Sequence, residues 1–317
     1  MISSLLSLSL GLASLSIETS KNLELPREGG RTISYSVTAP TTGGPYPVII
    51  FSHGMYGSEE GNTPLAEAWA KDGFVVIRPT HADSMRYADE ATRQNFRRGQ
   101  TNNASNWRER PGEISYLIDS LKTIEKQLPK VAGKLDRQVI GVGGHSYGAW
   151  TTQMVAGMEL GRGGMKLALG DSRPKAFISL APHGLTEGVT PESLAKMRGP
   201  MLMISGDNDH SPGKPESETA AFRTAAYKHS PSDGGRYLLW IKDAFHNFGG
   251  ATGSGGASDQ AMRALGHGGP ESPEIASAVR ETTLHFWRAT LKKDPAAQRW
   301  LDGKEIEKDG ISTLSHK

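Results

Sequence analysis

Short apolar runs alternate with amphipathic segments along most of this chain. The apolar runs are Pro47–Ser52, Phe74–Arg78, Val139–Val142, Ala176–Leu180, Pro200–Ser205 and Arg236–Ile241. Nearly continuous apolar runs of this length are typical of strands buried on both faces of a sheet. An earlier strand is expected at Thr32–Thr38, which is rich in β-branched and aromatic residues. The run at Arg236–Ile241 is expected to be the last strand.

Helices are predicted in the segments between these runs. Their expected ranges are Pro64–Asp72, Ile114–Leu128, Ala149–Ala156, Glu216–Lys228 and Glu274–Leu291. In the second range, apolar residues fall on one stripe, as in a helix with one buried face; they are Leu117, Ile118, Leu121 and Ile124. Strands that alternate with helices predict an α/β protein, with a mostly parallel central sheet and helices on both faces.

One long segment interrupts this alternation. His81–Pro111 is polar and has no steady apolar period, which indicates an insertion of functional importance in a compact domain. Its aromatic residues Tyr87, Phe96 and Trp107 either line a pocket or belong to solvated surface. Trp107 is the candidate in this segment for lining a substrate pocket.

Three further segments are expected to carry little regular structure. Pro182–Arg198 is mostly polar, Phe248–Gly269 is rich in Gly and Ser and is expected to be mobile, and the charged tail after Lys292 is expected to be peripheral. No linker or internal repeat divides the chain. Residues 21–317 are therefore predicted to form a single domain with an insertion around residues 81–111.

The first 20 residues allow two interpretations. Met1–Ile17 lacks charged side chains, and a small-residue exit at Gly11-Leu12-Ala13 fits a signal peptide, although no Lys or Arg precedes it. The alternation of leucine at positions 6, 8, 10 and 12 with small residues fits an N-terminal strand equally well. The signal-peptide interpretation slightly favours a secreted or periplasmic location over a cytoplasmic one.

Composition excludes several classes of function. The chain has 317 residues and a formal net charge of +2, so no broad basic field indicates nucleic acid. It has no cysteine, which excludes disulfides, thiolate metal sites and a cysteine nucleophile. The phosphate loop G-x-x-x-x-G-K is absent, and a dinucleotide fingerprint starting at Gly141 fails because Ser146 occupies its sixth position. No cofactor, no metal and no membrane-spanning segment are therefore expected, and the oligomeric state is left open.

The pentapeptide Gly144-His145-Ser146-Tyr147-Gly148 fits G-x-S-x-G. It lies between a predicted strand and a predicted helix, which is the setting in which this motif lifts a serine hydroxyl clear of the sheet. A serine hydroxyl is a poor nucleophile until a base within hydrogen-bond reach activates it, and that base needs an orienting group. Ser146 is therefore the candidate nucleophile.

Two downstream residues complete the serine–acid–histidine order that this topology requires. Asp209 follows one predicted strand and His246 follows the next, so both belong to the carboxyl edge of the sheet. We expect His246 to accept the hydroxyl proton and Asp209 to hold its tautomer. The rival histidines are at positions 210, 267 and 285, and those at 53 and 145 are expected to pack or bond locally.

An oxyanion needs two preorganised N–H donors. One should be the backbone N–H of Tyr147, at the start of the helix after the nucleophile. The other should come from the turn after the Pro47–Ser52 strand, and Met55 is the candidate. Gly54 lets that backbone approach closely, and Tyr56 could wall the substrate pocket.

These motifs resemble the α/β-hydrolase superfamily. Within it, the chain is similar to the dienelactone-hydrolase-related and platelet-activating-factor-acetylhydrolase-like serine esterases over roughly Pro47 to Trp287. The oxyanion turn, the nucleophile elbow, the acid and histidine loops, and the segment Trp107–Pro111 before a long helix carry the likeness. The family spacing Gly-x-x-Asp, counted from Gly206, selects Asp209 over Asp207. Dienelactone hydrolases proper use a cysteine nucleophile, which this chain lacks.

The resemblance implies a carboxylic-ester hydrolase that acts through an acyl-enzyme on Ser146, with a small-molecule ester or polyester as substrate. Polyester- and cutin-cleaving enzymes share the same core, so the substrate does not follow from it. Two alternatives stay open: a serine peptidase or amidase on the same sheet, and a non-catalytic binding protein that keeps the fold.

Overall fold

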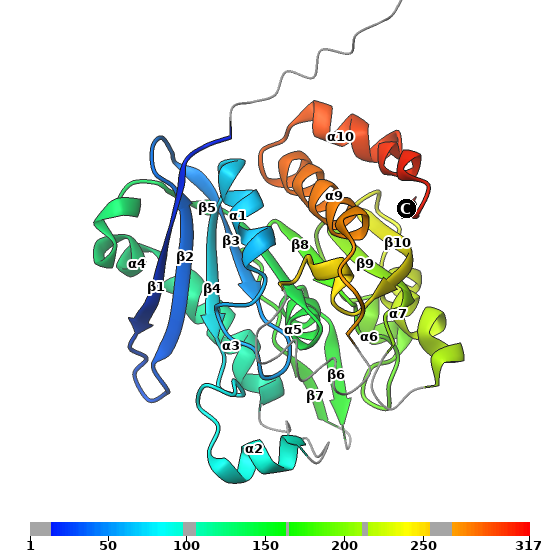
Figure 1. The fold of residues 1–317 in the computed structure, drawn as a ribbon. Helices are drawn as coiled ribbons and strands as arrows, with labels where there is room; N and C mark the ends of the chain where they lie inside the picture. The colour runs from blue at the N-terminus through cyan, green and yellow to red at the C-terminus, as the bar shows by residue number, and fades with distance from the viewer. Residues whose placement is uncertain (1–13, 98–105, 163–164, 211–214, 254–267) are drawn as a thin grey trace, which may run out of the picture.

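A computed structural model describes residues 14–97, 106–162, 165–210, 215–253 and 268–317 (Figure 1). Within them, nine strands form one sheet in the order β1-β2-β4-β3-β5-β8-β9-β10-β11. Their bounds are β1 (Ile17–Leu25), β2 (Ile33–Pro40), β3 (Tyr46–Ser52), β4 (Val75–Thr80), β5 (Leu135–His145), β8 (Ala176–Leu180), β9 (Met201–Asn208), β10 (Arg236–Phe245) and β11 (Ser312–His316). A separate hairpin joins β6 (Glu159–Arg162) to β7 (Met165–Ala168).

The middle of the sheet is parallel. From β4 through β3, β5, β8 and β9 to β10, each strand pairs in parallel with the next. At one end β1 and β2 pair antiparallel with each other, and β2 does so with β4, while at the other end β11 pairs antiparallel with β10. The carboxyl ends of six strands therefore meet along one edge, where α/β sheets bind their ligands.

Helices lie on both faces of this sheet. The described helices are α1 (Thr63–Lys71), α2 (Glu90–Arg97), α3 (Asn106–Asp119), α4 (Leu121–Gln127), α5 (Tyr147–Val155), α6 (Pro191–Leu194), α7 (Thr219–His229), α9 (Pro273–Leu291) and α10 (Pro295–Asp302). Short 3-10 turns occur at η1 (Pro129–Val131), η2 (Glu216–Glu218), η3 (Phe248–Gly250) and η4 (Glu305–Asp309). Residues of α3, α4, α5 and α7 pack on one face, and residues of α1, α9 and α10 pack on the other. The predicted α/β class is confirmed.

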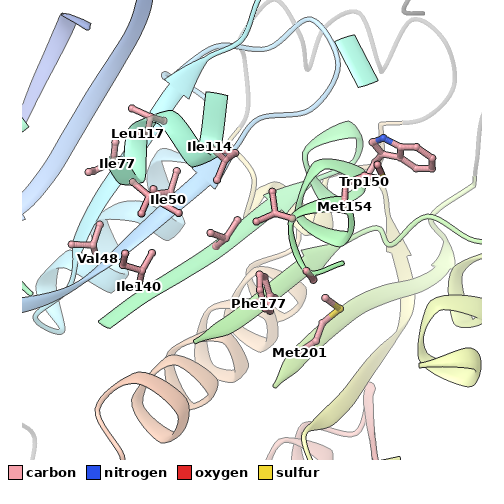
Figure 2. Packing of buried hydrophobic residues seen from close by; sticks show 14 of the residues in the cluster. Val48, Ile50, Ile77, Ile114, Leu117, Ile140, Trp150, Met154, Phe177 and Met201 are labelled. Atoms are coloured by element: carbon pink, nitrogen blue, oxygen red, sulfur yellow. The ribbon is translucent and has the colours of Figure 1, made fainter. Parts of the chain in front are cut away.

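The alternation along β3 shows why both faces need helices. Val48 and Ile50 belong to one buried cluster, whereas Ile49 and Phe51 belong to the other. Because successive side chains of a strand point to opposite faces, an all-apolar strand must be covered twice. On the first face, the apolar stripe of α3 packs against β3, β4 and β5 (Figure 2).

The expected ends of several elements are wrong. The strand expected to stop before Pro79 continues as β4 to Thr80. β3 pairs with β4 only as far as Ile77, whereas β2 pairs with β4 to Thr80. Pro79, which has no N–H to donate, therefore lies where β4 has β2 as its one paired neighbour. A break at Ser120 divides the single helix expected at Ile114–Leu128 into α3 and α4. In addition, α3 already begins at Asn106.

The described parts of the segment at residues 81–111, namely 81–97 and 106–111, contain more helix than their polarity indicated. They contain α2 and the first turns of α3, and Pro111 lies inside that helix. Similarly, α6 lies within the loop expected at Pro182–Arg198, and the β6–β7 hairpin lies in a stretch where no element was expected. These elements are short, so their apolar pattern is too brief to stand out.

The tail after Lys292 is not peripheral, and β10 is not the last strand. Leu301 of α10 and Leu314 of β11 are buried in the same cluster as α9, and β11 extends the central sheet. A five-residue strand with two buried side chains leaves too weak a pattern to be read from a charged segment.

Some predictions fall partly or wholly outside the described residues. The leucine alternation of residues 6–12 and most of the Gly- and Ser-rich loop are among them. The first described strand, β1, begins at Ile17, so it overlaps the end of the 20-residue N-terminal segment but follows the leucine alternation on which a strand was predicted there. No described helix combines the length and the apolar character that a membrane-spanning helix needs.

Candidate active site

Ser146 lies in a one-residue turn between β5 and α5. Its backbone has φ 58° and ψ −116°. A non-glycine residue in such a sparsely populated conformation costs of order 1–3 kcal/mol, and it persists only where its surroundings hold it. The Ser146 N–H donates to the carbonyl of Leu180 at the end of β8, 2.9 Å away. The residue is thereby held at the carboxyl edge of the sheet.

Two glycines allow this turn to form. A β-carbon on Gly148 would lie 2.0 Å from the carbonyl oxygen of Ser52, and a β-carbon on Gly144 would lie 2.2 Å from the carbonyl oxygen of Gly148. Both clashes are with backbone, which cannot move aside as a side chain can. The glycines of the motif thus have a steric cause.

Asp209 and His246 are in direct contact. Nδ1 of His246 bonds Oδ1 of the buried Asp209 at 2.6 Å. The other carboxylate oxygen accepts from the Ser205 hydroxyl at 2.7 Å, and Arg223 of α7 lies 3.1 Å from Oδ1. Burial alone would raise the pKa of this carboxyl, but the charges of Arg223 and His246 and the two hydrogen bonds outweigh it and lower the pKa. Asp209 is therefore held as a carboxylate facing an imidazole.

The alternative acid, Asp207, has a different environment. It is exposed and accepts from Nε1 of Trp240 at 2.8 Å and from the N–H of Asp243 at 3.0 Å. These contacts fasten the irregular end of β10, where the pairing with β9 shifts between Ile241 and Phe245. Asp207 therefore supports the bend that leads to the histidine loop.

The rival histidines have local partners. His210 bonds the Thr219 hydroxyl at 2.8 Å, and His285 of α9 stacks on Trp300 with ring centres 4.0 Å apart. His267 lies outside the described residues. Neither His210 nor His285 makes the contact that joins His246 to Asp209.

His145 links the nucleophile turn to the histidine loop. Its Nε2–H donates to the backbone carbonyl of His246 at 2.8 Å, and the two rings lie 4.7 Å apart. Burial, followed by the charge of His246, lowers the pKa of His145 to about 3. A neutral ring next to Ser146 thus anchors the main chain that carries His246.

The hydrogen bond from Ser146 to His246 is not formed in this structure. Nε2 of His246 is buried, and no group of the described residues accepts from or donates to it. Asp209 therefore occupies one side of the imidazole, while the other side carries an unpaired nitrogen. Catalytic hydrogen bonds of this kind often tighten only when substrate is bound.

The turn after β3 lies against the nucleophile. A β-carbon on Gly54 would be 3.5 Å from Cβ of Ser146. Tyr56 is buried with φ 62°, and its N–H donates to Asp83 at 3.4 Å. Tyr147 is the first residue of α5. Met55 and Tyr147, the expected oxyanion donors, thus belong to segments on either side of Ser146.

A cavity of about 670 Å³ lies beside α5. Trp107, Tyr147, Trp150 and His183 supply its aromatic lining. The ring of Trp150 lies 6.3 Å from that of Trp107 and 4.5 Å from that of His183. The volume falls in the range of small-molecule sites. Tyr56 does not line this cavity.

The other aromatic residues of the 81–111 segment differ from Trp107. Tyr87 is 40% exposed and carries Arg31 over its ring. The side chain of Phe96 lies outside the described residues. Of the two described aromatic side chains, Trp107 lines the cavity and Tyr87 does not.

A buried polar cluster behind the turn was missed from the sequence. Arg110 and Asp83 form an ion pair at 2.7 Å, with both side chains 1% exposed. Beside it, His81 contacts the Ser52 hydroxyl at 2.8 Å and Glu113 at 2.6 Å. Ser52, His81 and Glu113 thus have the contacts of a catalytic triad, but all three are buried within the protein. Burial lowers the pKa of His81. The sequence signal was the segment Trp107–Pro111, which contains Arg110 and carries part of the family likeness but indicates none of these contacts.

No group of three or more acidic or histidine side chains in the described segments has the arrangement of a metal site. The buried carboxylate in this region, that of Asp209, is instead paired with His246 and Arg223. Arg223 also donates to the carbonyl oxygens of Asp209, Ala181 and Pro182 at 2.9–3.2 Å.

The parallel sheet, with a strained serine turn after its fifth strand, is the fold of an α/β hydrolase. A family model described as Chlorophyllase matches residues 13–183, which is more than half of the chain. The chain belongs to the chlorophyllase family. The matched range includes the β3 turn and Ser146 but ends before Asp209 and His246. The match supports an ester hydrolase of the α/β type, and the finer likeness to dienelactone and acetylhydrolase enzymes stays a prediction. No curated protein matches the chain.

We predict that stability falls with pH below the ordinary pKa of histidine. The pKa of His145 is depressed in the folded state, so the unfolded state binds more protons below about pH 6.5. The stabilisation is complete above that pH and is lost as the pH falls towards the folded pKa. From pH 7 to pH 5, one such histidine lowers the free energy of unfolding by about 2 kcal/mol.

Urea unfolding at both pH values measures this effect. His145→Gln keeps a donor for the His246 carbonyl but cannot titrate, so its loss between pH 7 and pH 5 should be smaller. His316→Gln, on the exposed end of β11, is the matched control and should behave as wild type. An equal pH dependence in wild type and His145→Gln would contradict the assignment.

Proposed function

We propose that this protein is a serine carboxylic-ester hydrolase that acts through an acyl-enzyme on Ser146. One observation carries the proposal. His246 binds the buried Asp209 through Nδ1 and keeps an unpaired Nε2, and the neighbour of Ser146 in the chain holds the His246 carbonyl. A general base needs this arrangement: an orienting carboxylate on one nitrogen and a free nitrogen for the proton.

In the first step, Oγ of Ser146 attacks the ester carbonyl carbon while Nε2 of His246 takes the hydroxyl proton. The tetrahedral oxyanion accepts hydrogen bonds from the N–H groups of Met55 and Tyr147. The bond to the leaving alkoxide then breaks, and His246 gives it the proton. In the second step, water attacks the acyl-enzyme by the same route, which releases the acid and restores Ser146.

The carboxylate of Asp209 serves two purposes in this scheme. It fixes the imidazole tautomer with the proton on Nδ1, and it stabilises the imidazolium that forms when Nε2 is protonated. Its lowered pKa supports this role, because the group stays ionised at any pH where the imidazole acts as a base.

For the substrate, we propose an ester whose apolar acid or alcohol group enters the aromatic cavity next to Tyr147. Its volume of about 670 Å³ exceeds what an acetyl group needs. Chlorophyll, which the family's description refers to, and an aromatic polyester film belong in the substrate panel for this reason.

The proposal is tested by treating the protein with a fluorophosphonate and locating the adduct by mass spectrometry. We expect one adduct, on Ser146, and none in Ser146→Ala. Hydrolysis of p-nitrophenyl esters from acetate to palmitate should disappear in the same variant. Ser52→Ala is the matched control and should keep the adduct and the ester hydrolysis, because the Ser52 hydroxyl also contacts a histidine, His81, but is buried.

Other outcomes point to the alternatives. No adduct and no ester hydrolysis would indicate a non-catalytic protein of the same fold. An adduct on Ser146 with faster cleavage of aminoacyl anilides than of esters would indicate a peptidase. An adduct on another serine would remove Ser146 from the mechanism.

We predict that Asp209→Asn lowers kcat by about 10⁴-fold, because an amide no longer holds the correct imidazole tautomer. Asp207→Asn should change kcat less than about threefold, because Asp207 contacts β10 and not His246. Both are isosteric changes, and the comparison is made at equal folded fractions by circular dichroism. Equal losses, or the reverse order, would contradict Asp209 as the acid.

We also predict that Trp107→Ala weakens binding of long or aromatic esters. Losing one apolar ring from the cavity should raise KM by roughly tenfold for the hexanoate ester and leave KM for the acetate ester unchanged. Tyr87→Ala removes an exposed aromatic side chain from the same segment and should change neither. A uniform loss across all chain lengths would place the cavity outside the substrate path.

A further inference from the structure

We propose that Arg110, anchored by Asp83, is a positioning residue that aims the oxyanion-binding N–H groups at the reacting carbonyl. The inference rests on the proposed function, and concerns how the site after β3 is held in shape. Arg110 comes from α3 and is 1% exposed, so its charge is paired inside the protein, with Asp83.

The guanidinium is fixed on one side by a bidentate contact with a carboxylate. Nε of Arg110 donates to Oδ1 of Asp83 at 2.9 Å, and Nη2 donates to Oδ2 at 2.7 Å. Parallel bonds of this kind set the plane of the group as well as its place. Burial would raise the pKa of Asp83, but the charge and hydrogen bonds of Arg110 lower it, so the pair is ionic.

The remaining donors hold the backbone of the oxyanion turn. Nη1 donates to the carbonyl of His53 at 2.7 Å, and Nη2 donates to the carbonyl of Gly54 at 3.1 Å. In a planar trans peptide, the carbonyl of one residue and the N–H of the next point in opposite directions. When Arg110 holds the Gly54 oxygen, it therefore directs the N–H of Met55 to the opposite side of that peptide.

Two neighbouring contacts strengthen this orientation. The Gly54 oxygen also accepts from the N–H of Gly57 at 3.2 Å, and the N–H of Tyr56 is taken by Asp83 at 3.4 Å. The next donor along the turn is thus committed to the same ion pair. The α-carbon of Gly54 itself faces Ser146, since a β-carbon there would lie 3.5 Å from Cβ of the serine.

Arg110 also contacts the segment that carries the second donor. Its guanidinium lies over the ring of Tyr147, 4.4 Å from the ring centre. Tyr147 begins α5, and its N–H is the other proposed oxyanion donor. One side chain, itself 1% exposed, therefore touches both halves of the oxyanion site. Lysine has no planar fork and cannot keep this set of contacts.

The test compares Arg110→Lys with Arg236→Lys. Arg236 is also buried and also donates to backbone carbonyls, those of Gly199 and Met197, but it does so at the start of β10, the opposite edge of the sheet. Both variants should lose thermal stability. We expect Arg110→Lys to lower kcat by roughly 10- to 100-fold at unchanged KM, because the donors are misaligned rather than removed.

A second readout separates positioning from general damage. A trifluoromethyl ketone forms a tetrahedral adduct on the serine, and the oxyanion donors stabilise that adduct. The affinity of the ketone should fall in Arg110→Lys by the same factor as kcat, and it should be unchanged in Arg236→Lys. Should Arg110→Lys fail to fold, Asp83→Asn carries the same test, with a smaller loss in the same two quantities.

The inference is overturned if Arg110→Lys matches Arg236→Lys in kcat and in inhibitor affinity, or if only KM changes. This failure differs from failure of the proposed function. In the first case, wild type is labelled at Ser146 and hydrolyses esters, and only the arginine variant departs from expectation. If wild type is neither labelled nor active, both proposals are wrong.

Discussion

The close approach of two backbones at the nucleophile turn is the constraint on which the site depends. The start of α5 passes so near the end of β3 that no β-carbon fits on Gly148 beside the Ser52 carbonyl. This contact fixes α5 relative to the turn that follows β3. Because Tyr147 belongs to one segment and Met55 to the other, the same contact sets the distance between the two proposed oxyanion donors. The strained backbone of Ser146 is a consequence of this packing, and the hydrogen bond to Leu180 helps to hold it.

Two buried arginines have parallel roles on either side of that turn. Arg110 neutralises Asp83 and holds carbonyls of the β3 turn, while Arg223 neutralises Asp209 and holds carbonyls after β8 and β9. A buried carboxylate without such a partner would be protonated or would destabilise the fold. In both places the charge pair is combined with main-chain bonds, so that the same guanidinium stabilises an ion and shapes a loop. The arrangement explains how carbonyl groups of irregular backbone find hydrogen-bond donors inside the protein.

The sequence contains enough information for the middle of the fold but not for its ends. The strands at Pro47–Ser52 and Ala176–Leu180 could be located because all-apolar runs are unambiguous in an α/β protein. β11 could not, because a short edge strand has few buried positions. The pentapeptide around Ser146 and the positions of Asp209 and His246 could be read from motif and order. The role of Arg110 could not be predicted, because its contacts join residues 27 to 58 positions apart and no local sequence pattern indicates them.

The docking of β11 has a consequence for how the molecule folds. β10, which leads into His246, gains its second neighbour from a segment about seventy residues further along, and until Ser312–His316 has been synthesised and docked, one row of its N–H and C=O groups has no partner. An unpaired strand edge is prone to join other chains. A nascent chain that already contains all of the proposed catalytic residues would therefore still carry an open edge, and a chaperone that shields it would act at β10.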